Sequence, residues 1–160
     1  MAILTNSGRA AVAAAVKAQA LHMAWGSGDP AWDTTPITEP AEATALINEI
    51  GRRRATQVLF CTPNAQGELV VPTGRFTVSV EPTKYLYMRF SFDFVDAPAS
   101  TIREVAVFVG TVPKGTVPPG QDYIVPSEVE NPGQMLALEY IAKMERSADV
   151  RQQFEFVIQF

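Results

Sequence analysis

Histidine and cysteine are nearly missing from this chain, which has one of each among its 160 residues. A single cysteine, Cys61, excludes an internal disulfide and falls short of every zinc-ligand spacing, which fits synthesis in a reducing cytosol. Because Cys61 ends the apolar run 58–60 (VLF), we expect it to be a small buried core residue. With His22 as the only histidine, the side chain that most often serves as the base in nucleophilic catalysis is scarce.

Long apolar runs and an excess of positive charge are also missing. No stretch approaches the ~18 consecutive apolar residues of a membrane span, and residues 1–4 lack the basic start of a signal peptide, so we expect no membrane insertion. The net charge of -4 argues against a nucleic-acid partner, because phosphates require a basic surface. The one basic run, residues 52–54 (RRR), we interpret as the cationic end of a short helix rather than as a phosphate site.

Catalytic motifs are absent as well. Residues 26–28 (GSG) have the wrong spacing for a nucleophile elbow, and no Walker lysine follows a glycine loop. In 21–25 (LHMAW), the large apolar residues Leu21, Met23 and Trp25 share one face of a predicted short strand. His22 lies on the opposite face, so we expect its polar side chain on the outer side of that strand. Asp93 and Glu104 could form a glycosidase pair on neighbouring strands, but surface charge explains both more simply. We therefore expect no enzyme, no metal and no cofactor.

The composition, 47% hydrophobic and 19% charged, is that of a globular protein. The chain is long enough to bury a hydrophobic core that needs no disulfide or metal site. Thr5 and its neighbours predict the start of an alanine-rich helix over 8–20. Residues 41–49, closed by Gly51, predict a second short helix. From residue 56 onward the pattern is that of strands.

The clearest strand signal is 85–95 (YLYMRFSFDFV), where Leu86, Met88, Phe90, Phe92 and Phe94 fall on one face. Residues 101–110 predict a more apolar, central strand, and 134–143 and 154–160 complete the set, with the C-terminus paired within the sheet. We expect one domain over 1–160 of the α+β, mainly β class: short N-terminal helices in 1–55, then an antiparallel β-sandwich of about seven strands in 56–160.

Four short segments carry a resemblance when taken in order. They are 4–9 (LTNSGR) before the alanine-rich helix, 25–29 (WGSGD) after the first strand, 48–53 (NEIGRR), and 102–108 (IREVAVF). Their order resembles the N-terminal, tail-attaching domain of bacteriophage tail-collar fibre and baseplate-associated tail proteins.

The resemblance implies a structural protein of the virion, synthesised in the host cytoplasm and placed at the tail tip. A chain of this length is more similar to a baseplate subunit or tail-fibre adaptor than to a complete fibre. Its expected partners are other tail and baseplate proteins, the tail fibre, and further copies of itself in a trimer or a ring of three- or sixfold symmetry.

Candidate subunit contacts follow from the same reading. The turn 26–30 between the two tryptophans, the small-residue helix and the proline-stiffened loop 111–121 are the expected contact regions. The candidate residues are Trp25, Trp32, Arg9, Val12, Val16, Arg52, Arg53, Pro113, Pro118 and Pro119.

The alternative function is a carbohydrate-binding β-sandwich that recognises a glycan on the host surface. Its binding platform would consist of exposed aromatic rings, for which Trp25, Trp32, Tyr85 and Tyr87 are the candidates. Assembly predicts instead that such rings are buried between subunits.

Overall fold

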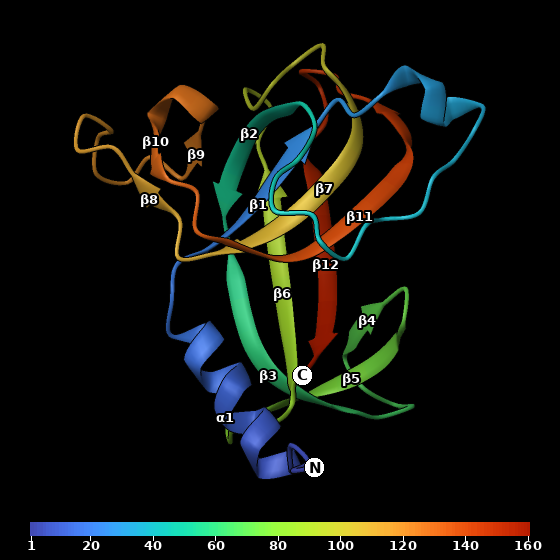
Figure 1. Ribbon diagram of the computed structural model, residues 1–160, viewed down its shortest axis with the longest axis vertical. Helices are drawn as coiled ribbons and strands as arrows, with labels where there is room; N and C mark the ends of the chain where they lie inside the picture. Colours follow the sequence, from blue (N-terminus) through green and yellow to red (C-terminus); the bar gives the residue numbers. More distant parts are fainter. The chain divides into compact units, whose positions relative to one another are not determined.

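The computed structural model describes residues 1–160 and is built mainly from antiparallel strands, with one α-helix and two short 3-10 helices (Figure 1). The mainly β, α+β class is therefore confirmed. The chain divides into two compact units. Unit 1 contains Met1–Gln19, Ala55–Phe90 and Gln153–Phe160, and unit 2 contains Ala20–Arg54 and Ser91–Gln152. That the whole chain behaves as a single domain stays a prediction.

The elements in chain order are α1 (Asn6–Lys17), β1 (Leu21–Gly26), η1 (Pro30–Asp33), β2 (Glu49–Arg54), β3 (Gln57–Pro63), β4 (Leu69–Val71), β5 (Gly74–Ser79), β6 (Tyr85–Phe92), β7 (Thr101–Val109), β8 (Val112–Pro113), β9 (Tyr123–Ile124), η2 (Pro126–Glu128), β10 (Val129–Asn131), β11 (Gln134–Glu145) and β12 (Gln152–Gln159). The strands outnumber the seven expected, because short pairs such as β8 with β10 form inside stretches that look like loops in the sequence.

The predicted first helix is present as α1. The Thr5 hydroxyl accepts a hydrogen bond from the backbone N–H of Gly8 at 3.2 Å, which satisfies one of the free donors at the helix start. Alanine, the best helix former, fills much of the interior. The longest helix, α1, has 12 residues, and none of the helices could span a membrane.

Unit 2 contains a five-stranded sheet of order β11-β7-β1-β2-β9, with β1 in its centre. Every residue of β1 is buried, so this strand has no outer side. The prediction of an outward-facing His22 is wrong for that reason, and the side chain is only 5% exposed. Ala24 packs with Leu46, Ala106 and Phe108 in the core of this unit.

The predicted second helix is not formed. Residues 41–48 contain turns and bends, and Glu49–Arg54 is strand β2, paired with β1 so that Arg53 lies opposite Met23 and Gly51 opposite Trp25. The three arginines consequently belong to a strand and not to a helix end. Pairing with a buried central strand outweighed the local helix propensity of this segment.

Unit 1 contains most of the second five-stranded sheet, of order β12-β6-β3-β5-β4. The predicted apolar face of β6 is confirmed for Leu86, Met88, Phe90 and Phe92, which are fully buried, whereas Phe94 lies beyond the strand and is 40% exposed. The strand ends at Phe92 rather than at residue 95. Tyr87, on the other face, is also buried, in a second core around Cys61, Val71 and Phe76, so both faces of this strand are covered.

Candidate functional site

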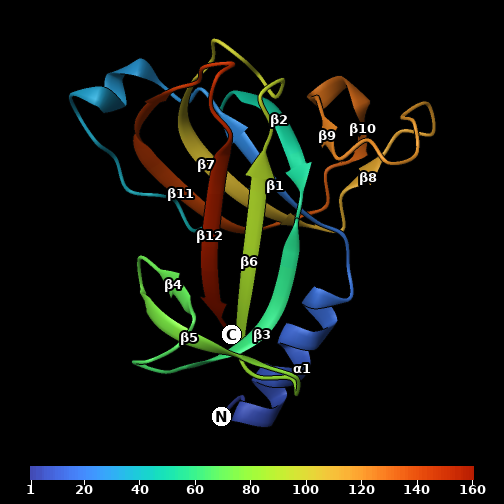
Figure 2. The same cartoon turned by 180° about the vertical axis from the view of Figure 1, so that it is seen from behind.

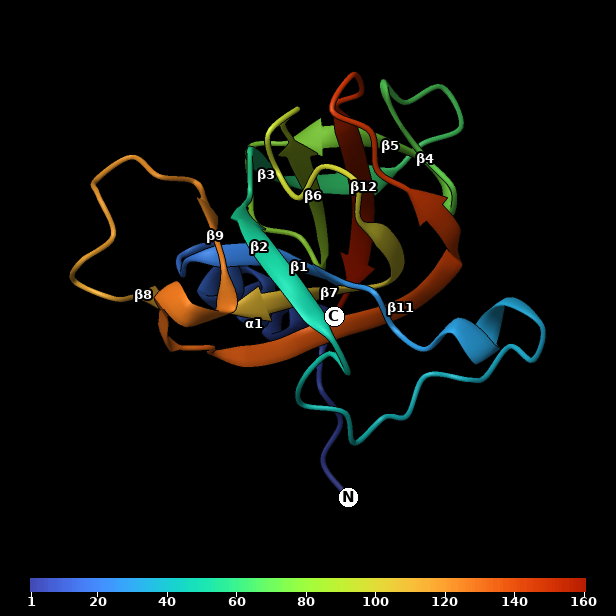
Figure 3. The ribbon, with the colours of Figure 1, turned by 90° about the horizontal axis from the view of Figure 1, so that it is seen from above.

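The most distinctive surface element of unit 2 is the segment 27–48, called here the long loop, which leaves the sheet after β1 and returns to it at β2 (Figure 3). It begins in a tight turn where Gly28 has a φ of 57° and lies under the Trp32 ring. A Cβ at Gly28 would come within 2.5 Å of that ring. The Asp29 carboxylate then caps η1 by accepting the backbone N–H of Ala31 at 2.8 Å.

Arg103 of β7 fixes the first part of the long loop. Its guanidinium donates two hydrogen bonds to the Asp33 carboxylate, at 2.7 and 2.8 Å, and a third to the backbone oxygen of Ser27 at 3.1 Å. The hydrogen bond from Arg103 lowers the pKa of Asp33 and raises that of Arg103 itself. This two-pronged geometry holds a carboxylate in one orientation, which a lysine could not do.

The middle of the long loop lies along the edge strand β11. The Trp32 ring packs against Tyr140, with ring centroids 4.3 Å apart. The Glu39 carboxylate accepts the backbone N–H of Tyr140 at 2.9 Å. Burial raises the pKa of the Tyr140 hydroxyl. An oxygen of the loop therefore occupies the place that a neighbouring strand's carbonyl would take.

Glu104 fixes the returning end of the long loop. Its side chain is fully buried, and its two carboxylate oxygens accept the backbone N–H groups of Ile47 at 3.1 Å and Asn48 at 2.9 Å. The Asn48 amide in turn donates to the backbone oxygen of Gly28 at 3.1 Å, so the two ends of the loop are tied together. Leu46, between these contacts and the middle of the loop, is 7% exposed in the core of unit 2.

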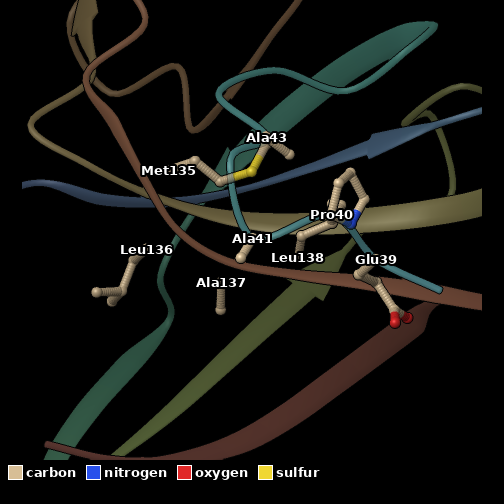
Figure 4. Close-up of a pocket in the computed structure, with 8 residues that line it drawn as sticks. All are labelled: Glu39, Pro40, Ala41, Ala43, Met135, Leu136, Ala137 and Leu138. Atoms are coloured by element: carbon tan, nitrogen blue, oxygen red, sulfur yellow. The ribbon is translucent and has the colours of Figure 1, made fainter.

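A shallow pocket of about 210 Å³ lies between the long loop and β11 (Figure 4). Met135 and Leu138 line it from β11, Ala43 and Pro40 line it from the long loop, and the Glu39 carboxylate lies at one end. The remaining lining residues are Ala41, Leu136 and Ala137. With one carboxylate and no second polar side chain, the lining suits an apolar side chain better than a polar small molecule.

The two candidate arginines of β2 act inside the fold. Arg52 is 2% exposed, pairs with Glu49 at 2.8 Å, and donates to the Thr111 hydroxyl at 2.9 Å and the Pro132 carbonyl oxygen at 2.8 Å. It therefore fixes both ends of residues 111–132, which include the proline-stiffened loop. Arg53 pairs with the buried Asp96 at 2.5 Å.

The remaining candidate contact residues differ in how much surface they present. Trp25 is fully buried, its ring stacks on Phe92 with centroids 3.7 Å apart, and its indole N–H donates to the Tyr123 hydroxyl at 3.2 Å, so its side chain, like that of Arg52, is enclosed within the chain. Val12, Pro118 and Pro119 are exposed, and Arg9, Val16, Trp32, Arg53 and Pro113 are half-buried. Subunit contact by these exposed and half-buried residues stays a prediction.

The glycan platform loses two of its four rings, since Trp25 is fully buried and Tyr87 is 2% exposed. The proposed carboxylate pair is not formed on neighbouring strands, because Asp93 follows β6 and Glu104 lies on β7, in different sheets. Asp93 is held by Arg151 at 2.9 Å, and Glu104 is occupied by backbone groups. Surface charge was the wrong interpretation of Glu104.

His22 and Cys61, the single histidine and the single cysteine of the chain, are both buried. Burial, followed by the charges of Arg52 and Arg54, lowers the pKa of His22 from 6.5 to about 4, so the imidazole is neutral, and its Nδ1 has no hydrogen-bond partner. Cys61 is fully buried as predicted, and burial raises its thiol pKa to about 11. No group of three histidine, cysteine, aspartate or glutamate side chains is placed to hold a metal ion.

Sequence reasoning missed Arg103, Glu104, Glu39 and Tyr140 as the residues that hold the long loop. One signal was present, since Arg103 and Glu104 are adjacent charges in an otherwise apolar strand that was expected to be central. Charged residues inside a buried strand require partners, and those partners had to come from another part of the chain.

These features define a mainly β protein in which charged side chains fix long surface loops to an antiparallel sheet. Over its whole length, residues 1–160, the chain belongs to the family described as "Baseplate wedge 3 tail fiber network component". It is thus a member of a phage baseplate and tail-fibre family, which confirms the resemblance found in the sequence. A comparison with curated proteins found no match to this chain.

Proposed function

We propose that the protein is a non-enzymatic structural subunit, either of the baseplate itself or as an adaptor for the tail fibre, that works through protein–protein interfaces. Its partners would be other baseplate and tail proteins, the tail fibre and copies of itself in three- or sixfold arrangement, after synthesis in the host cytoplasm. The family membership supports the location in the tail, and the long loop supports the mode of action.

The observation that carries the proposal is how the long loop is held. Arg103, Glu104 and Tyr140 bind it at its beginning, end and middle, while Ile37 and Ile47 remain 47% and 57% exposed. Exposed apolar side chains on a loop that is already ordered lose little conformational entropy on binding, which favours a rigid protein interface. The loop 111–121, fixed at its base by Arg52, offers a second such surface.

The test is quantitative mass spectrometry of gradient-purified particles from the source phage. We expect the chain in stoichiometric amounts, in copy numbers that are multiples of three or six. Complete absence from the particle would overturn the proposal.

The contribution of the long loop is tested by complementation with Ile37→Asp, which places a charge on its exposed surface. We expect fewer copies per particle, with the purified variant folded as the parent. The matched control is Val70→Asp on β4, a side chain of similar exposure, 54%, outside the long loop. Equal incorporation of both variants would exclude the long loop as the contact.

A further inference from the structure

Strand β12 forms an open edge of its sheet. It stands at the end of the order β12-β6-β3-β5-β4, so only β6 is hydrogen-bonded to it. The backbone N–H of Phe160 donates to the Lys84 carbonyl oxygen at 2.9 Å, so the end of β12 meets the start of β6, and the two strands run in opposite directions (Figure 2).

The same hydrogen bond determines which backbone groups of β12 face outward. Successive residues of an antiparallel strand direct their N–H and C=O groups to alternate sides. Since Phe160 faces β6, the residues that alternate with it, Glu155, Val157 and Gln159, direct their backbone groups away from the sheet. Three donors and three acceptors thus line the open edge between Glu155 and Gln159.

The chain protects its other long edge and leaves this one unprotected. On β11 the pairing contains two register shifts, and the Glu39 carboxylate occupies the Tyr140 N–H. Strand β12 and the residue after it, 152–160, contain no proline, glycine or lysine. Their one charged side chain is Glu155. Proteins normally prevent an edge strand from pairing with another chain by placing a proline, a bulge or charged side chains such as lysine on it. An apolar, nearly uncharged edge without them is suited to pairing with another strand.

We propose that β12 pairs with β12 of a second copy of this chain, antiparallel across a twofold axis at Val157. In this register Val157 lies opposite Val157 of the second copy. Glu155 of each copy lies opposite Gln159 of the other, so this pair occurs twice. All six outward backbone groups of each copy are then matched. The Gln159 amide can donate to the facing Glu155 carboxylate, and no two like charges oppose each other, so the edge is complementary to itself.

The side chains of this face support the same register. Val157 packs on the unit 1 core around Cys61 and Tyr87, and Glu155 and Gln159 flank it on that face. Glu155 accepts a hydrogen bond from Gln153 Nε2 at 2.6 Å and is also hydrogen-bonded to the Tyr87 side chain; since each carboxylate oxygen can accept more than one hydrogen bond, the facing amide can still donate to it. The inference uses only this edge, and it does not depend on the proposed function.

The experiment measures self-association of the full chain by sedimentation equilibrium over a dilution series. We expect a reversible dimer of twice the 17.4 kDa chain mass. Gln159→Glu places two like-charge pairs across the axis and should raise the dimer dissociation constant about tenfold. Gln159→Lys should lower it by a similar factor, and the double variant Glu155→Lys with Gln159→Glu, which reverses the same opposite-charge pairs, should lower it to about the value of Gln159→Lys.

Each outcome decides the matter. A monomer at all concentrations overturns the proposal, and so does a trimer as the smallest associated species. A dimer that responds equally to Gln159→Glu and Gln159→Lys overturns the register, because Gln159 then does not face Glu155. Circular dichroism of each variant checks that the fold is kept, which is expected because Gln159 is exposed.

Discussion

Arg103 and Asp33, seventy positions apart in the chain, are joined by two parallel hydrogen bonds of 2.7 and 2.8 Å. This pair converts the beginning of a polar, proline-containing segment into an ordered part of unit 2. It acts together with Glu104, the next residue of β7, which holds the other end of the same segment.

Removing the Arg103 guanidinium should loosen the long loop without unfolding the sheet. In Arg103→Met, we expect faster hydrogen exchange at the backbone amides of Trp32, Thr34 and Thr35, which bond within the turn that Asp33 belongs to. Hydrogen–deuterium exchange measured by mass spectrometry provides the test. Arg151→Met, which removes an exposed arginine paired with Asp93, is the control and should leave this loop unchanged.

Glu104→Gln should destabilise the protein by about 1–3 kcal/mol, because a neutral amide offers one acceptor oxygen where two buried backbone donors need one each. Urea unfolding measures the loss. Glu139→Gln changes the same side chain at an exposed position of β11 and should alter the free energy of unfolding little. Equal effects of the two variants would contradict the role assigned to Glu104.

His22 should make the stability depend on pH. Its pKa is about 4 in the folded protein and 6.5 in the unfolded chain, so between these values the unfolded state binds the extra proton. The free energy of unfolding is therefore unaffected by protonation of His22 above pH 6.5. As the pH falls from 6.5 towards 4, protonation of His22 in the unfolded chain lowers it by up to about 3 kcal/mol. His22→Gln should flatten this part of the stability–pH curve; a curve identical to that of the parent would refute the assignment.

Gly51→Ala should cost about 1–3 kcal/mol through overpacking. A Cβ at this position would lie 2.2 Å from the Tyr123 hydroxyl, which also accepts the hydrogen bond from Trp25. We expect a lower midpoint of thermal unfolding and an altered tryptophan emission spectrum. At Gly115 no atom lies within 4 Å of the added Cβ, so Gly115→Ala should have nearly the parental midpoint.

Cys61 should be unreactive in the native protein. The thiol is fully buried, and burial raises its pKa to about 11, so thiolate is scarce at neutral pH. Titration with a chromogenic disulfide reagent should detect no thiol until denaturant is added, and then one per chain. Fast labelling of the native protein would show that the unit 1 core opens locally.

The elements that were predicted from sequence are those whose pattern is complete within one segment. Helix α1 has its cap and its alanines in sequence, and β6 has an unbroken alternation from Leu86 to Phe92. Residues 41–54 misled the prediction because their local composition favours a helix, whereas their pairing partner, β1, lies elsewhere in the chain. The order of four weak segments was enough to suggest the family.

By itself, then, the sequence determined the mainly β class, the buried cysteine and the scarcity of catalytic groups, since composition and periodicity express these directly. Only the tertiary structure decided what the charged residues do. Whether Arg52, Arg103 and Glu104 face water or hold a loop depends on which distant backbone groups come within hydrogen-bond distance, and strand pairing between remote segments sets those distances. The open edge of β12 is equally a property of the sheet order, which no local pattern contains.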